Sequence, residues 1–213
     1  MAYDLEEQES IDQMKAWWEK WGTPITAAVC ICCLGFAGWN GWRWYQQNQV
    51  NKASAVYVAL QTAVINRDQK NIQSTSEGLI NEYGSTVYAP LGAMTAAAAK
   101  SGASDFEGAI KLLNWVINDS GYSEYADVAR VRLAAVQLSA GQPDAALATL
   151  SHIKTSKALE AEVNDRYGDA YLAKKDYDKA RESWQKVLTQ VDMVDDNLKT
   201  IVGFKLGAIP AKE

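Results

Sequence analysis

The chain has 213 residues and a mass of 23.4 kDa, which allows one or two domains. Hydrophobic residues make up 48% of it and charged residues 22%, a balance that excludes a wholly disordered chain. The net charge of −5 and the single histidine, His152, argue against a nucleic-acid-binding surface and against a site built from several histidines. Only four prolines, beside many alanines, favour an all-α protein.

An acidic tail, residues 1–20, precedes a long stretch without charge. Between Lys20 and Arg43 lie 22 uncharged residues. As a helix they extend over about 33 Å, close to the ~30 Å hydrocarbon thickness of a bilayer. Six of the eight tryptophans flank this stretch, and indole rings settle at the level of the lipid headgroups. We therefore predict a transmembrane helix over residues 21–45 with tryptophans at its two membrane interfaces, namely Trp17, Trp18, Trp21, Trp39, Trp42 and Trp44.

Two other interpretations of this stretch fit less well. A buried core helix needs an apolar stripe, and not uncharged residues all round with tryptophan at both ends. A cleaved signal peptide begins with a basic region, whereas this tail is acidic. Trp39 and Trp42 also stand where such a peptide needs a small-x-small cleavage site. The sequence predicts an uncleaved single-span anchor, but lysine and arginine are equally few on its two sides, so charge leaves the orientation open.

Small residues are frequent inside the predicted span. Its three cysteines are interpreted as small apolar groups, because nothing nearby completes a metal or redox site. Small residues along the second half would let another helix approach closely, although glycine is also simply common in membrane helices. The candidate helix-packing residues are Gly35, Gly38 and Gly41.

After a short connector, residues 46–52, the chain reads as a series of helices over residues 53–206. Apolar residues recur there at intervals of three and four, and no run alternates with period two. A terminal capping helix is predicted over 195–206, followed by a C-terminal tail, 207–213. The predicted helix starts are a capping box from Ser104 to Glu107, Pro143 in a first turn, and Asp176 as an N-cap.

Three segments of this region align with one another. Residues 134–150 match 168–184 at an offset of 34, and 97–113 match 134–150 at an offset of 37. Each has a small residue in its first helix, then a polar break, then an alanine four positions before a large apolar residue. Antiparallel helices approach closely only where a small residue lies at their crossing.

This pattern resembles the tetratricopeptide repeat. The clearest copy is the last, with Tyr167, Gly168, Tyr171, Tyr177, Ala180 and Trp184 at the family's spacing. Lys175 stands where glycine is often found between the helices, and the first unit, about 53–83, is degenerate. The expected fold is all-α, with a single N-terminal transmembrane helix followed by a tetratricopeptide-repeat-like helical array.

Helical arrays of this kind bind peptides or partner helices on the face formed by their first helices. In the last two units the predicted groove positions combine an apolar patch with two carboxylates. The alternative is that the apolar members belong to the core and the carboxylates form a solvated face. These candidate groove residues are Val131, Ala135, Leu138, Asp165 and Asp169.

The order of acidic tail, tryptophan-flanked span and short repeat domain resembles the YfgM-like family over essentially the whole chain. The matching segments are AWWEKWG before the span, GFAGWNGWRWYQQNQ at its exit, and GDAYLAKKDYDKAR in the last unit. The resemblance implies a Gram-negative inner-membrane protein with a cytoplasmic N-terminus and a periplasmic repeat domain. It also implies an ancillary subunit of the SecYEG translocon that works beside PpiD, a membrane-anchored periplasmic chaperone.

The expected function is therefore a membrane-tethered, non-enzymatic scaffold at the exit of the translocon. The alternative is a regulatory adaptor for a membrane-bound signalling or envelope-assembly system. The sequence shows no nucleophile with a base at readable spacing and no glycine-rich phosphate loop after a strand. No catalytic residue, cofactor, metal, nucleic acid or small-molecule substrate is therefore expected.

Overall fold

A computed structural model describes residues 2–154, 157–189 and 194–210, with side chains from residue 9 onward. In these ranges the chain forms nine α-helices and one short 3₁₀ helix, and no strand. The predicted all-α fold is therefore confirmed. Met1 of the predicted tail 1–20 and residues 211–213 of the predicted tail 207–213 lie outside the described ranges. The chain divides into two compact units, residues 1–49 and 50–213.

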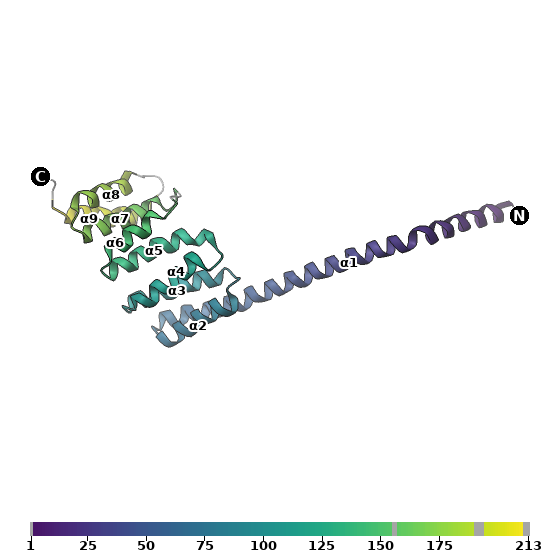
Figure 1. The fold of residues 1–213 in the computed structure, drawn as a ribbon, viewed down its shortest axis with the longest axis horizontal. Helices are drawn as coiled ribbons and strands as arrows, with labels where there is room; N and C mark the ends of the chain where they lie inside the picture. The colour runs from purple at the N-terminus through teal and green to yellow at the C-terminus, as the bar shows by residue number, and fades with distance from the viewer. Residues whose placement is uncertain (1, 155–156, 190–193, 211–213) are drawn as a thin grey trace. The chain divides into compact units, whose positions relative to one another are not determined.

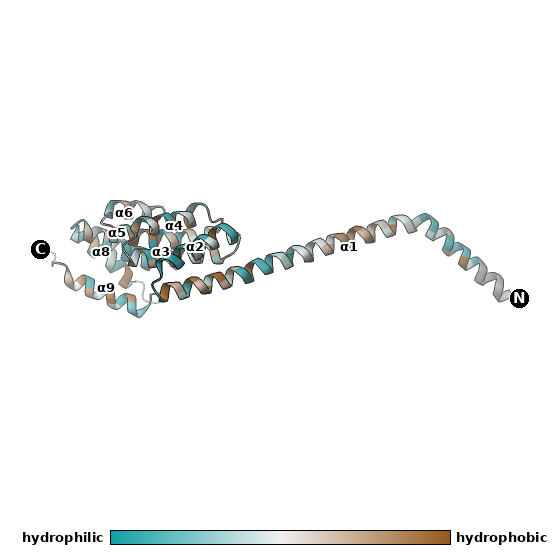
Figure 2. Ribbon diagram, turned by 90° about the horizontal axis from the view of Figure 1, so that it is seen from below, coloured by the Kyte–Doolittle hydropathy of each residue, from teal (hydrophilic) through white to brown (hydrophobic). Residues whose placement is uncertain are grey.

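The first unit consists of one helix, which continues into the second unit. Helix α1 (Ala2–Ile65) runs without a break through the predicted boundaries at residues 20, 45 and 52 (Figure 1). It is the one helix in the described residues that is long and apolar enough to cross a membrane, and brown residues in Figure 2 mark its apolar stretch. Leu34 and Phe36 are 73% and 72% exposed, so no protein core covers this stretch.

The second unit is a stack of helix pairs. Each pair has a first and a second helix, and a single helix, α9, closes the series. The first pair is the end of α1 with α2 (Gln69–Tyr83). The remaining elements are α3 (Tyr88–Gly102), α4 (Phe106–Asn118), η1 (Ser123–Tyr125), α5 (Ala126–Ser139), α6 (Pro143–Ser151), α7 (Glu160–Ala173), α8 (Tyr177–Thr189) and α9 (Asp196–Ala208).

The first helix of each of the four pairs ends in the same turn. One residue takes a left-handed conformation, with φ between 55° and 73°, and its N–H donates to the carbonyl three residues back. The next N–H donates to the carbonyl five residues back, which makes each turn a Schellman motif. The left-handed residues of the four pairs are Arg67, Ser104, Gly141 and Lys175.

This turn corrects one predicted helix start and supports two others. Ser104 is not an N-cap, because it is the left-handed residue of its turn, and Asp105 caps α4 by accepting a hydrogen bond from the Gly108 N–H at 3.0 Å. Pro143 lies in the first turn of α6, as predicted. Asp176 accepts a hydrogen bond from the Lys179 N–H at 3.3 Å, so it caps α8 as predicted, directly after Lys175 in the glycine-like position.

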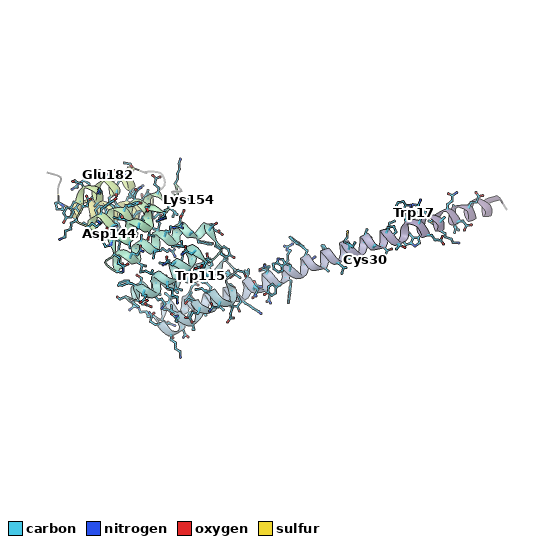
Figure 3. All side chains as sticks on the ribbon, in the orientation of Figure 1. Trp17, Cys30, Trp115, Asp144, Lys154 and Glu182 are labelled. Atoms are coloured by element: carbon cyan, nitrogen blue, oxygen red, sulfur yellow. The ribbon has the colours of Figure 1, made fainter. Side chains whose placement is uncertain are left out.

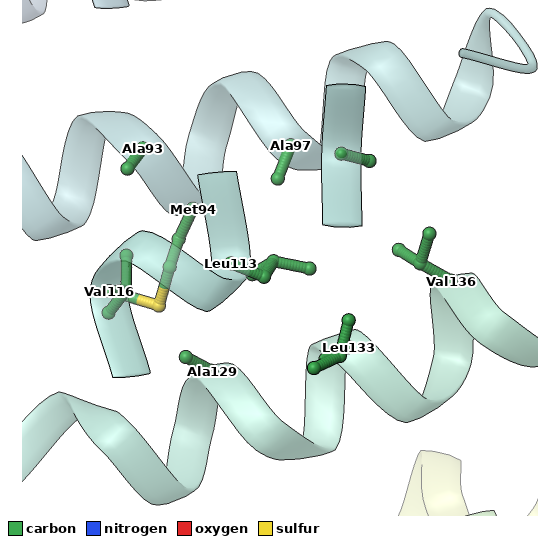
Figure 4. Close-up of a cluster of buried hydrophobic side chains, with 9 residues drawn as sticks. Ala93, Met94, Ala97, Leu113, Val116, Ala129, Leu133 and Val136 are labelled. Carbon is green, nitrogen blue, oxygen red and sulfur yellow. The ribbon is translucent and has the colours of Figure 1, made fainter. Parts of the chain in front are cut away.

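The buried core of the described residues consists of four clusters that repeat along the stack, one for each helix pair. Each buried cluster joins the two helices of one pair to the first helix of the next: α1, α2 and α3; α3, α4 and α5; α5, α6 and α7; α7, α8 and α9. Figure 4 shows the second of these clusters, with Ala97 of α3 beside Leu113 of α4. The small residues that aligned in the sequence, Ala97, Ala134 and Gly168, are all buried where the helices of a pair meet.

Gly168 has the tightest of these contacts. A Cβ atom there would lie closer than 3.0 Å to three atoms of the Trp184 indole, which is itself fully buried. We predict that Gly168→Ala lowers the free energy of unfolding by about 1–3 kcal/mol, because the ring has no space into which to move. Urea unfolding of the full chain in detergent, followed by circular dichroism, measures this change.

Gly78 in α2 provides the matched control. A Cβ at Gly78 would meet no atom within 4 Å. Gly78→Ala should therefore leave stability unchanged or raise it by up to about 1 kcal/mol through helix propensity. Equal stability of the Gly168→Ala and Gly78→Ala variants would contradict the packing described for the last pair.

Candidate interaction site

Successive first helices lie closer together than successive second helices. Helix α3 contacts α5, and α5 contacts α7, whereas α4 and α6 make no comparable contact among the described residues. Pairs that touch more closely on one side form a curved array whose inner face carries α3, α5 and α7. This inner face is where such arrays bind extended segments or helices of other proteins.

A cleft of about 300 Å³ opens on this face between α3 and α5. Small side chains leave the space, and Met94, Leu113 and Val136 give it an apolar floor. Arg132 is the charged residue at its rim and has no ion-pair partner among the described side chains. The cleft can therefore hold an apolar side chain beside a carboxylate. Its other lining residues are Ala97, Ala98, Ser101, Ala135 and Ser139.

The structure separates the three predicted apolar groove residues. Ala135 lines the cleft between α3 and α5. Val131 and Leu138, on the same helix, are partly buried against the cluster shared by α5, α6 and α7. This placement agrees with the alternative in which Val131 and Leu138 are core residues, while Ala135 remains a predicted groove residue.

The two predicted carboxylates on α7 belong to an ionic cluster. Asp165 is only 2% exposed, so the alternative of a solvated face is wrong for it. The Lys205 ammonium, from α9, lies 2.6 Å from one oxygen of Asp165 and 2.6 Å from one oxygen of Asp169. The Arg166 guanidinium lies 2.8 Å from the second Asp169 oxygen. Neither carboxylate is available to a partner while α9 is in place.

The ionic cluster is continuous with the core of the last pair. The Lys205 ammonium lies 5.6 Å from the centre of the Trp184 ring, and the indole N–H donates to the Asp165 carbonyl oxygen at 3.3 Å. One lysine thus connects α9 to both α7 and α8. Local sequence reasoning could not find this residue, because 36 and 40 positions separate it from the two aspartates.

Burial raises the pKa of Asp169, while its hydrogen bond to Lys205 lowers it. The net shift is upward, so the folded protein holds a proton on Asp169 more tightly than the unfolded chain does. The contribution of Asp169 to stability is therefore largest at low pH and is lost as the pH rises through the folded pKa.

The membrane residues remain predictions. The six tryptophans of the span and its three cysteines are exposed on α1, and Figure 3 shows Trp17 and Cys30 among them. A Cβ at Gly35, Gly38 or Gly41 would meet no atom within 4 Å. The surface of α1 along these three glycines is therefore open to a partner helix. Within the described residues, no group of three or more histidine, cysteine or acidic side chains could hold a metal ion.

Lys205 can be tested through its pH dependence. We predict that Lys205→Met lowers the free energy of unfolding at pH 7 by about 3 kcal/mol, because it removes the nearest cation from the buried Asp165 carboxylate and leaves only Arg166, 3.8 Å away. The loss should shrink at pH 5, since removing Lys205 raises the pKa of Asp169 further and lets the folded state take up a proton. Urea unfolding at the two pH values measures both effects.

Lys199→Met, on the same helix, is the control for this test. Lys199 pairs with Asp196, which is 96% exposed, and such surface pairs contribute about 0–1 kcal/mol. A Lys205→Met penalty no larger than that of Lys199→Met, or one that is the same at pH 5 and pH 7, would contradict the assigned role of Lys205.

Comparisons with known proteins agree with this architecture. A family model described as a tetratricopeptide repeat-like domain matches residues 15–211. A protein of Haemophilus influenzae named ancillary SecYEG translocon subunit is 30% identical over 197 residues, covering 90% of this chain and 96% of its own. Proteins of the same name from Aggregatibacter actinomycetemcomitans and Neisseria gonorrhoeae are 31% and 26% identical, covering 93% and 90% of this chain and 96% and 91% of their own. No solved structure matches the chain.

The family model extends from within the predicted tail to beyond α9, and the relatives align over about nine-tenths of the chain. The predicted resemblance is therefore confirmed over helix α1 and the repeat array together. The chain belongs to the YfgM-like family of tetratricopeptide-repeat-like proteins, whose members include ancillary SecYEG translocon subunits.

Proposed function

We propose that this protein is an ancillary subunit of the SecYEG translocon that works as a membrane-tethered, non-enzymatic scaffold. Residues 21–45 cross the inner membrane once, the N-terminal tail lies in the cytoplasm, and the repeat array lies in the periplasm. One observation carries the proposal: relatives with that printed name match the chain over about 90% of its length. The match therefore extends well beyond a single repeat.

The two units have separate tasks in this proposal. The tryptophan-flanked part of α1 fixes the depth of the chain in the bilayer. The exposed surface along Gly35, Gly38 and Gly41 then lets a transmembrane helix of the translocon pack closely against α1. Close backbone approach supplies the van der Waals contact on which helix association in lipid depends, because lipid removes the hydrophobic driving force.

The inner face of the array contacts proteins that leave the translocon, or a PpiD-like periplasmic chaperone that receives them. A segment that has not yet folded exposes apolar side chains, and the cleft between α3 and α5 can hold one of them. Such a contact is weak by itself because the cleft is small. Tethering to the same membrane raises the effective concentration of the array near the translocon, so weak binding suffices.

Site-specific photocrosslinking in the native membrane tests this proposal. A photoreactive residue at Gly38 should capture a translocon subunit, and one at Ala98, an exposed residue of the cleft, should capture a secreted protein or a periplasmic chaperone. Phe36 is the control in the span, because it lies about 200° around the helix from Gly38. Glu182 on α8 is the control on the array.

The outcomes separate the proposed function from its alternative. Capture of translocon subunits at Gly38, with little at Phe36, supports the scaffold role. Recovery of neither a translocon subunit nor a periplasmic chaperone from either position would overturn it. Capture of signalling or envelope-assembly proteins would favour the regulatory adaptor instead.

A further inference from the structure

Helix α9 has one face packed on the array and one face open. Val202 is fully buried against α7 and α8, with Leu198 and Leu206 partly buried beside it. On the opposite side, Ile201 is 50% exposed and Phe204 is 75% exposed. Helix α9 is the last described helix, and the outer face of a helix that caps a repeat array is normally polar, so two large apolar side chains on its outer face need an explanation.

The core clusters place α9 as the first helix of a further pair. It joins the cluster of α7 and α8 in the way that α3, α5 and α7 join the clusters of the pairs before them. The spacing agrees, because Gly203 follows Gly168 by 35 residues, between the offsets of 34 and 37 found for the earlier units. Helix α9 is thus a first helix by both contact and register.

The second helix of this pair is absent from the described residues. In the earlier units the small residue of the first helix is buried against the second helix, as Gly168 is against Trp184. Gly203 is exposed, and a Cβ built on it would meet no atom within 4 Å. The outer face of α9 is therefore the uncovered half of an interface that is completed in every preceding pair.

The outer face of α9 carries no charge that would keep two copies of it apart, and its shape allows it to pair with itself. From Asn197 to Ala208 its exposed residues are uncharged. The two lysines of α9 are partly buried, and Lys199 pairs with Asp196 of the same helix while Lys205 pairs with Asp165 and Asp169 of α7. Two identical copies therefore bring no like charges together. At 100° per residue, three small and two large residues of this face fall within an arc of about 160° around the helix. They are Thr200, Gly203 and Gly207 on one side and Ile201 and Phe204 on the other.

We propose that α9 pairs with α9 of a second copy of this chain, each serving as the second helix of the other's last pair. A two-fold axis perpendicular to both helices makes them antiparallel, which is the geometry of the helix pairs in this kind of array. The axis brings small residues against small residues, so the helices approach closely. Phe204 and Ile201 of the two copies then pack against each other across the interface between the two α9 helices.

The expected association is weak in solution and stronger in a membrane. One helix pair buries less surface than the roughly 800 Å² per partner of a standard interface. Two copies anchored in the same bilayer meet at a higher effective concentration. The inference holds whether or not the translocon is the partner of α1, so its test does not depend on the proposed function.

Disulfide trapping of the full chain in lipid nanodiscs tests the pairing. In a background in which Cys30, Cys32 and Cys33 are changed to alanine, Gly203→Cys lies near the two-fold axis and should give a covalent dimer on mild oxidation. Asn197→Cys is the matched control on the same face. It lies six residues from the axis, so the two copies of residue 197 are about 18 Å apart, beyond disulfide reach.

The expected result is roughly tenfold more disulfide-linked dimer from Gly203→Cys than from Asn197→Cys. Adding Phe204→Glu should abolish it while the circular dichroism spectrum stays unchanged, because Phe204 is largely exposed in one copy. The pairing is overturned by the absence of dimer at position 203, by equal dimer at both positions, or by persistence of the dimer with Phe204→Glu. In native membranes, a Gly203→Cys adduct with a different protein, and none with a second copy, would also overturn it.

Discussion

The uncharged part of α1 is the constraint on which the rest of the protein depends. Its 22 residues form a helix whose apolar side chains no protein core covers. Water is a poor environment for such a surface, and each exposed apolar Å² costs about 25 cal/mol. A bilayer removes the whole circumference of the helix from water, and the flanking tryptophans match the two headgroup regions. The proposed tether rests on this burial, whereas the proposed orientation of the array rests on the family resemblance.

The array depends on two local devices that repeat along the chain. A Schellman turn reverses the chain within each pair, with a left-handed residue followed by the residue that caps the second helix. Small side chains such as Ala134 and Gly168 then let the two helices approach. Because a core cluster joins each pair to the first helix of the next, no pair completes its core alone.

Sequence reasoning worked where the signal was periodic or local. The helical period, the small-residue spacing and the tryptophan belts predicted the all-α fold, the repeat units and the single candidate span. The capping box at Ser104 was wrong by one residue, because the left-handed turn residue precedes the cap and Ser104 occupies that turn position. A serine-x-x-glutamate pattern cannot distinguish the two roles.

The candidate site was harder to predict because its contacts are long-range. Asp165 and Asp169 were predicted on the groove face, with a solvated face as the alternative, yet both pair with Lys205 of α9. The sequence could not identify Lys205, since only the tertiary packing of α9 against the last pair brings this side chain close to α7. Conversely, Ala135 lies at the cleft because α3 and α5 touch, a contact between helices of different units.

Protease accessibility from each side of the membrane tests the central claim most directly. In spheroplasts an external protease should digest the repeat array and spare the N-terminal tail, and in inverted vesicles it should do the reverse. This pattern requires a chain that crosses the bilayer once between tail and array. Digestion of both ends from the same side, or release of the intact chain into the soluble fraction, would contradict the account.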